Sequence, residues 1–208
     1  MWLLASAFAA KVTVPVDVGV GPCAVVPNGE AFAQQPVYGA LLFSLQAVID
    51  KETLQQNKKR IPREYRSMLK DMDEVRITPK IWIPDVIYLS PPVQGAGLYG
   101  LGWRFIGMGV PLGPIDVDAG VIATAMYLHG PALAPTLFLR PGLSARVEFE
   151  QALDTDSTWL FSLGWESRVH IPQELGGFGV SADPLNDLWH LGHGYVKVHR
   201  RFPYTVRI

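Results

Sequence analysis

The chain has little charge, almost no cysteine and no long apolar run. Only 18% of its 208 residues are charged, and the formal net charge is -1. An ordinary soluble domain carries about 25% charged residues, so much of this surface lacks the composition of a wall that faces water. The balanced charge also offers no basic surplus to attract nucleic acid, and we expect no nucleic-acid partner.

The single cysteine, Cys23, excludes an internal disulfide, and we interpret it as a small buried apolar side chain. No segment approaches the ~18 to 20 consecutive apolar residues that a spanning helix needs, so any crossing of a membrane must use strands. We expect neither a cofactor nor a metal. His190 and His193 are three residues apart, which sends them to opposite faces of a strand.

Residues 1–10, MWLLASAFAA, have the apolar core and small-residue end of a secretory signal peptide, without its basic start. We interpret them as a signal-peptide remnant, which predicts export. Residues 11–208 then form a single domain, as their number allows.

Alternation of apolar and polar residues dominates the rest of the chain. In STWLFSLGWESRVHI, residues 157–171, the apolar side chains from Trp159 onward fall on every second position, with Glu166 and Arg168 between them. This period is typical of strands with one apolar and one polar face. The eight predicted strands span residues 12–20, 37–49, 80–89, 98–110, 115–127, 136–150, 159–171 and 194–208.

The connections and irregularities add detail to these strands. Short turn-like links at 111–114, 129–135 and 154–157 favour an antiparallel meander. The alternation in 98–110 loses phase near Gly107, which predicts a β-bulge. Pro84 weakens the strand at 80–89, since proline cannot donate to a sheet ladder.

Alternation does not say which face is inside, because a soluble barrel buries its apolar face. Here the apolar faces carry more large rings than eight strands can enclose, among them Trp103, Trp159 and Trp165. The polar faces mix acids and bases, as a closed polar interior requires. The strongly alternating strands place no arginine on the apolar face, where it costs about 2–4 kcal/mol at mid-bilayer. We therefore predict that the apolar faces meet lipid.

The same phase predicts a charged network inside the barrel. Its members are Arg104, Asp116, Asp118, Arg140, Arg146, Glu148, Glu166, Arg168 and Lys197.

The last segment, GYVKVHRRFPYTVRI, ends on alternating Phe202, Tyr204, Val206 and Ile208. In this the sequence resembles the small bacterial outer-membrane β-barrel class, whose members end in such a strand, which their assembly machinery reads. The chain departs from the class pattern in ending on Ile rather than Phe, and in Pro203. The resemblance covers this strand and, more loosely, residues 100–208. It implies a barrel in the outer membrane of a Gram-negative cell, in contact with its lipid.

One part of the chain is unlike the rest in its charge. The chain has 18 basic and 19 acidic residues, and 13 of these 37 charged residues fall in 51–76. Within it, PREYRSMLKDMD at 62–73 has apolar residues at helical spacing after a proline suited to a first turn. We predict one amphipathic helix in an insertion at 51–74. It either caps one barrel end or contacts lipid or a partner protein. The contact residues would be Arg63, Tyr65, Arg66, Met68, Leu69 and Met72.

The predicted fold is all-β: an eight-stranded antiparallel up-and-down transmembrane barrel, with one amphipathic helix between the second and third strands. With the N-terminus in the periplasm, 21–36 and 172–188 lie outside the cell. The short links at 111–114 and 151–156 and the insertion then lie in the periplasm.

The favoured function is a structural one: an anchor or scaffold for an envelope complex, with a periplasmic or envelope partner docking on 51–74. No residue is assigned a catalytic role in this hypothesis. One alternative is a lipid-modifying outer-membrane hydrolase using Ser162, His170 and an acid such as Glu166, which share a face. The other is a soluble secreted barrel that binds an apolar ligand, with its faces inverted.

Overall fold

The computed structural model of the chain describes residues 11–29, 32–34, 36–59, 63, 78–83, 86–89, 97–130, 133–171 and 190–207. The segment predicted as a signal remnant, the loop at 172–188 and most of the helix predicted at 62–73 lie outside these residues. Of the contact residues predicted for that helix only Arg63 is described, and its side chain is exposed.

The described residues form strands and one short helix. The strands are β1 (Lys11–Pro27), β2 (Tyr38–Ile49), β3 (Thr78–Ile83), β4 (Val86–Leu89), β5 (Gly97–Leu112), β6 (Ile115–Gly130), β7 (Leu133–Ala152), β8 (Trp159–His170) and β9 (His190–Arg207). Helix α1 (Lys51–Gln56) lies between β2 and β3. Among the described residues, no helix has the length and apolar character to cross a membrane.

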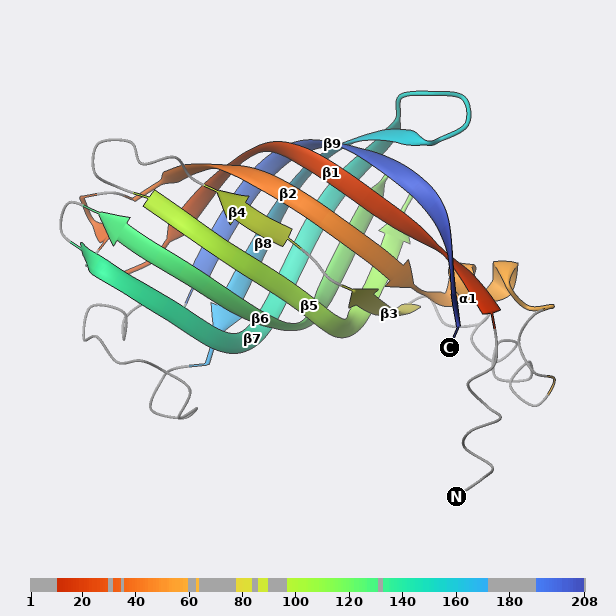
Figure 1. The fold of residues 1–208 in the computed structure, drawn as a ribbon, viewed down its shortest axis with the longest axis horizontal. Coiled ribbons are helices and arrows are strands. Elements are labelled where there is room, and N and C mark those ends of the chain that lie inside the picture. The colour runs from red at the N-terminus through yellow and green to blue at the C-terminus, as the bar shows by residue number, and fades with distance from the viewer. Residues whose placement is uncertain are drawn as a thin grey trace, which may run out of the picture.

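The strands close into a ring in which every neighbouring pair is antiparallel (Figure 1). Closure is made by β1 and β9, whose aligned pairs run from Lys11 with Arg207 to Pro27 with Leu191. Both β3 and β4 pair with β2 on one side and β5 on the other, so they share the third of eight positions. The predicted eight-stranded antiparallel barrel is confirmed.

Local irregularities fall where the sequence indicates them, with one exception. The register of β5 on β6 shifts between Arg104 and Gly107, and both Phe105 and Ile106 face outward, as a bulge requires. Strand β3 ends at Ile83 and β4 begins at Val86, and the effect predicted for Pro84 lies outside the described residues. The outer loop predicted from residue 21 begins later, because β1 continues to Pro27 while paired with β9.

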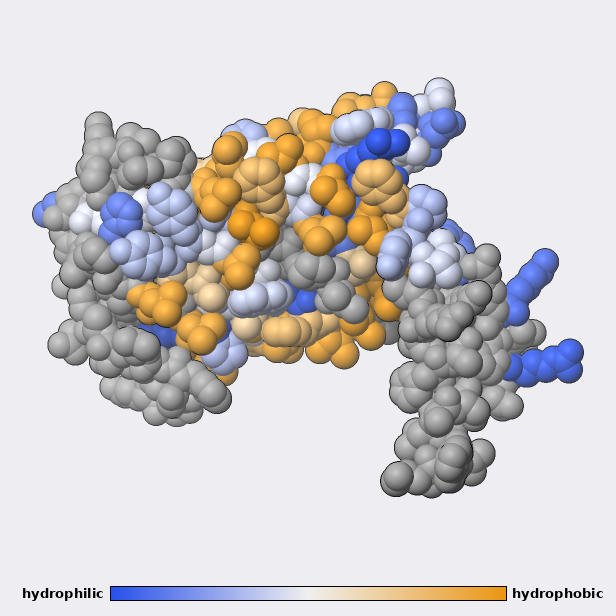
Figure 2. All heavy atoms as spheres, viewed as in Figure 1, coloured by the Kyte–Doolittle hydropathy of each residue, from blue (hydrophilic) through white to orange (hydrophobic). Residues whose placement is uncertain are grey.

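The apolar side chains form the outer wall of the barrel. Trp159 and Trp165 are 45% and 48% exposed, whereas Arg168 is fully buried. Apolar residues gather over the middle of the wall, with hydrophilic residues toward its ends (Figure 2). This orientation rules out the inverted, soluble barrel. The expectation of an arginine-free outer face was wrong at one position, since Arg200 also faces outward.

The start of β1, the end of β9 and helix α1 lie at one end of the barrel, here called the α1 end (Figure 1). Helix α1 begins after Asp50, whose side chain accepts a hydrogen bond from the Thr53 backbone N–H at 2.8 Å. Asn57 follows the helix and fixes it to β1. Its side-chain oxygen accepts from the Thr13 backbone N–H, and its side-chain nitrogen donates to the Thr13 carbonyl, both at 2.8 Å.

The turn between β7 and β8 also lies at the α1 end, and Asp154 organises it. Its carboxylate accepts from the Thr158 hydroxyl, from the Thr158 backbone N–H at 2.8 Å and from the Trp159 backbone N–H at 3.1 Å. These bonds, the one from the Thr158 hydroxyl first, lower the pKa of the Asp154 carboxyl from its ordinary value. The Asp154 carboxylate is therefore charged at neutral pH and accepts all three hydrogen bonds. Their contribution to stability is lost only as pH falls through that lowered pKa.

We expect Asn57→Ala to release α1 from the first strand. The substitution removes both bonds to Thr13 and leaves partly buried backbone groups unsatisfied, a cost of about 1 kcal/mol. Amide hydrogen exchange of the folded protein in detergent should be faster at Thr13 and across α1. Lys58→Ala, which removes an exposed side chain one residue later, should leave that exchange unchanged; equal effects from the two variants would contradict the assigned role of Asn57.

Candidate functional site: the polar lumen

The side chains inside the barrel form three layers along its axis. An apolar layer lies at the end away from α1, ion-paired side chains fill the middle, and a water-accessible vestibule opens at the α1 end. Because inward residues alternate along each strand, each layer takes members from several strands.

The apolar layer is a packed cluster that sequence reasoning did not find. Its members are Cys23, Val25, Phe32, Tyr38, Leu42, Tyr88, Leu98, Met126, Leu128, Leu191 and Tyr195. Phe32 meets Tyr38 edge to face, with ring centroids 6.4 Å apart. These residues share the phase of the polar faces, so the inward phase was visible, but their apolar character at one end of it was overlooked.

The central ion-pair group surrounds Glu166 on β8. One carboxylate oxygen, Oε1, lies 2.5 Å from Nη2 of Arg104 on β5 and 3.1 Å from Nε of Arg168. The other oxygen, Oε2, lies 3.2 Å from Nε2 of His193 on β9. Arg168 also donates to the Thr124 hydroxyl of β6 at 3.3 Å. One carboxylate thus contacts two guanidinium groups at the centre of the lumen.

A second group lies nearer the α1 end and links four strands. Asp118 on β6 is 2.7 Å from Lys80 Nζ of β3 and 2.5 Å from Arg146 Nη2 of β7. Nη1 of Arg146 also lies 3.3 Å from the carboxylate of Glu148. That carboxylate accepts a hydrogen bond from the Tyr195 hydroxyl. The Lys197 ammonium of β9 lies 3.1 Å from Glu148.

The nine residues predicted for the interior network all take part in this lumen. Eight of them are buried, and Asp116 is half-buried at the vestibule, 3.4 Å from Lys80. Arg140 is buried on β7 beside the position of Thr124 in the β6–β7 register. Sequence reasoning left Lys80, His193 and Tyr195 out of the network, although each has the inward phase.

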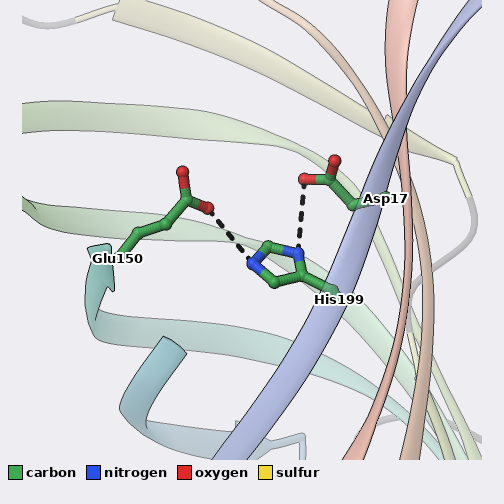
Figure 3. A group of neighbouring side chains, drawn as sticks. All are labelled: Asp17, Glu150 and His199. Carbon is green, nitrogen blue, oxygen red and sulfur yellow. Dashed lines mark ion pairs between the residues drawn. The ribbon is translucent and has the colours of Figure 1, made fainter. Parts of the chain in front are cut away.

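A third cluster borders the vestibule and joins Asp17 of β1, Glu150 of β7 and His199 of β9 (Figure 3). His199 Nδ1 lies 3.7 Å from the Asp17 carboxylate, and Nε2 lies 3.5 Å from that of Glu150. Arg201 bridges the two acids, at 2.8 Å from Asp17 and 3.1 Å from Glu150.

This third cluster has ligand atoms suited to a cation. One atom from each of the three residues lies within 4.8 Å of the others, a set of oxygen and imidazole ligands that would suit zinc. However, the Arg201 guanidinium already donates hydrogen bonds to both carboxylates. A metal would have to displace this arginine, so we assign the cluster as an ion-pair group.

The serine hydrolase alternative meets a different geometry from the one expected. Ser162 Oγ is 3.0 Å from Nε2 of His199, and His170 lies eight residues further along the strand, about 26 Å at the rise of a strand. The predicted trio of Ser162, Glu166 and His170 is therefore not brought together. Ser162 is fully buried inside the lumen, away from the acyl chains outside the wall.

The vestibule has a volume of about 540 Å³. Six acids and three bases line it, together with Thr53 and Gln56 of α1. Its charged walls are Asp17, Asp50, Lys80, Asp116, Arg146, Glu148, Glu150, Asp156 and Arg201. The cavity is thus acidic on balance, and α1 forms part of its rim.

Comparisons with known proteins find likeness in fold alone. No protein-family model and no curated protein matches the chain. Among solved structures, the chain is similar to Neisserial surface protein A, with a TM-score of 0.47, 8% identity, and 91% of this chain and 97% of that one covered.

Two further structures are similar over nearly their whole lengths. Ail, the attachment invasion locus protein of Yersinia pestis, solved with the heparin analogue sucrose octasulfate, has a TM-score of 0.38 at 6% identity, over 91% of this chain and 99% of that one. The outer membrane protein OprG of Pseudomonas aeruginosa has a TM-score of 0.37 at 11% identity, over 96% and 99%. At these scores the similarities carry no argument on function. Strand pairing and burial alone establish that the chain has the architecture of a small outer-membrane β-barrel.

Glu166→Gln should destabilise the barrel strongly, because Arg104 and Arg168 lose the buried carboxylate that both of them contact. Breaking a buried pair typically costs about 3–5 kcal/mol. The free energy of unfolding, measured by urea titration in lipid vesicles, should fall by that order. Asp116→Asn is the matched control, because its side chain is half exposed and the expected loss is about 0–1 kcal/mol. Equal losses would contradict the central place of Glu166.

Proposed function

We propose that this protein is a non-conducting barrel of the bacterial outer membrane that anchors or scaffolds an envelope complex, with its α1 end in the periplasm. The observation that carries the proposal is the filled lumen. A barrel whose interior is occupied along most of its length holds a position in the membrane without passing solutes.

Two barriers of different chemistry support the non-conducting role. The apolar layer includes Leu98 and Leu128, both fully buried, and it excludes water and ions. The central group around Glu166 fills the next level with paired charges. The vestibule, lined by residues of the α1 end, stops at the level of Arg146 and Glu148.

The α1 end supports the scaffold role because helix α1, which begins the insertion, is fixed to the wall. Asn57 joins the helix to β1 through two hydrogen bonds, and Asp50 caps its start. Beyond α1, Lys58 and Lys59 are exposed and lead into the charged insertion. A partner that binds there would be held at a defined place relative to the membrane.

The lipid hydrolase is the weaker candidate. The hydrogen bond between Ser162 and His199 favours it, because an imidazole beside a serine hydroxyl can act as the base that activates the serine as a nucleophile. The buried, inward position of Ser162 separates its hydroxyl from lipid acyl chains. The geometry therefore favours the anchor.

In planar bilayers we expect the full-length protein to show no stepwise ion conductance, since both barriers must be crossed. A variant with Leu42→Ala, Leu98→Ala and Leu128→Ala removes bulk from the apolar layer and should show brief conducting events. Heat-dependent gel mobility confirms that each protein is folded before measurement. Regular conducting steps from the unaltered protein would overturn the non-conducting role.

The scaffold role is tested by photo-crosslinking in cells. A photoreactive residue at Lys58 or Lys59 should give one discrete adduct with an envelope protein, because both positions begin the insertion. The same residue at Thr155, exposed on the turn between β7 and β8 at the same end, is the matched control and should not give that adduct. Adducts of equal yield at Thr155, or none at 58 and 59, would count against docking on the insertion.

A further inference from the structure

We infer that Arg200, on the outer wall between Trp159 and Phe202, binds the phosphate of an anionic phospholipid in the leaflet at the α1 end. The inference rests on the membrane location proposed above, but not on the scaffold role.

The strand register fixes the direction in which Arg200 points. Its neighbours on β9, His199 and Arg201, face the lumen and contact Asp17 and Glu150. Arg200 aligns with Val18 of β1 and Trp159 of β8. Val18 and Trp159 are both exposed on the outer wall, so Arg200 is a cation within an apolar surface.

Two aromatic rings hold the guanidinium group. Its central carbon lies 5.6 Å from the centre of the Trp159 ring and 4.9 Å from that of Phe202. Both distances are within the range of cation–π contacts. The rings can stack on the flat guanidinium, which leaves its N–H groups at the edge to donate to a planar or tetrahedral anion.

Among the described residues, the charge of Arg200 has no carboxylate partner. Arg201, one residue further, contacts two carboxylates, whereas within the described part of the chain no carboxylate pairs with Arg200. A lipid-facing arginine is costly at the bilayer centre and nearly free near the interface, where lipid phosphates accept its hydrogen bonds. The missing counter-charge is therefore expected from the membrane.

The depth of Arg200 fits a headgroup. Trp159 is the first residue of β8 and directly follows the turn held by Asp154, so this level is the edge of the apolar belt. On the other side of Arg200, Val198 and Val20 continue the exposed apolar wall. A phospholipid can place its phosphate at Arg200 and its acyl chains along these valines.

The test is native mass spectrometry of the full chain, released from detergent containing equal amounts of phosphatidylglycerol and phosphatidylcholine. The unaltered protein should retain phosphatidylglycerol roughly fivefold more than phosphatidylcholine, the preference expected from one interfacial arginine. Arg200→Met keeps the length of the side chain and should abolish the preference, whereas Arg200→Lys should keep part of it.

Trp165→Leu is the matched control, since it removes an exposed ring from the outer wall six residues along β8 from Trp159, and it should leave the preference unchanged. The inference is overturned if the unaltered protein shows no preference, or if Arg200→Met retains it. Should Arg200→Met fail to fold, Trp159→Leu and Phe202→Leu replace it and should each weaken the preference. Failure of the unaltered protein to insert into vesicles would instead contradict the membrane location.

Discussion

A charge inside this barrel must meet an opposite charge, because the narrow lumen cannot hydrate it fully. The structure meets this constraint with groups that join distant strands: Glu166 of β8 reaches Arg104 of β5, and Asp118 of β6 reaches Lys80 of β3. A shift of any one strand by a residue would send its charge into lipid and leave another charge alone inside. The ion pairs therefore fix the register of the wall as well as filling its interior.

The same crowding explains small residues on the inner wall. A Cβ atom added to Gly19 would lie 2.6 Å from the Cβ of His199, closer than side chains approach. A side chain at Gly102 would collide with the guanidinium of Arg168. Glycine at these positions makes room for the long side chains that pair across the lumen, so wall and filling depend on each other.

The sequence predicts the strands of the barrel well, and the contacts between side chains inside the lumen less well. Alternation, together with the β-rich composition of 80–89, identifies all eight ring positions, and Gly107 marks the bulge, because those features are local to one strand. Which residues meet across the lumen depends on the stagger of the strands, which no single segment encodes. Ser162 thus contacts His199 rather than His170.

The errors share a cause: the outer and inner phases were each treated as uniform. Leu98 and Leu128 are apolar residues on the inner phase and form a seal at one end. Arg200 is a charged residue on the outer phase and aligns with Trp159, the first residue of β8. In both cases position along the axis, rather than face, determines the role.

The seam between β1 and β9 has a consequence for how the barrel forms. These two strands align fifteen pairs of residues, from Lys11 with Arg207 to Pro27 with Leu191. The two partners of every pair are far apart in the sequence, so this ladder forms late. Until β9 arrives, β1 presents an open edge whose backbone N–H and C=O groups lipid cannot satisfy. Assembly in the bilayer therefore needs that edge to be covered until the seam shuts.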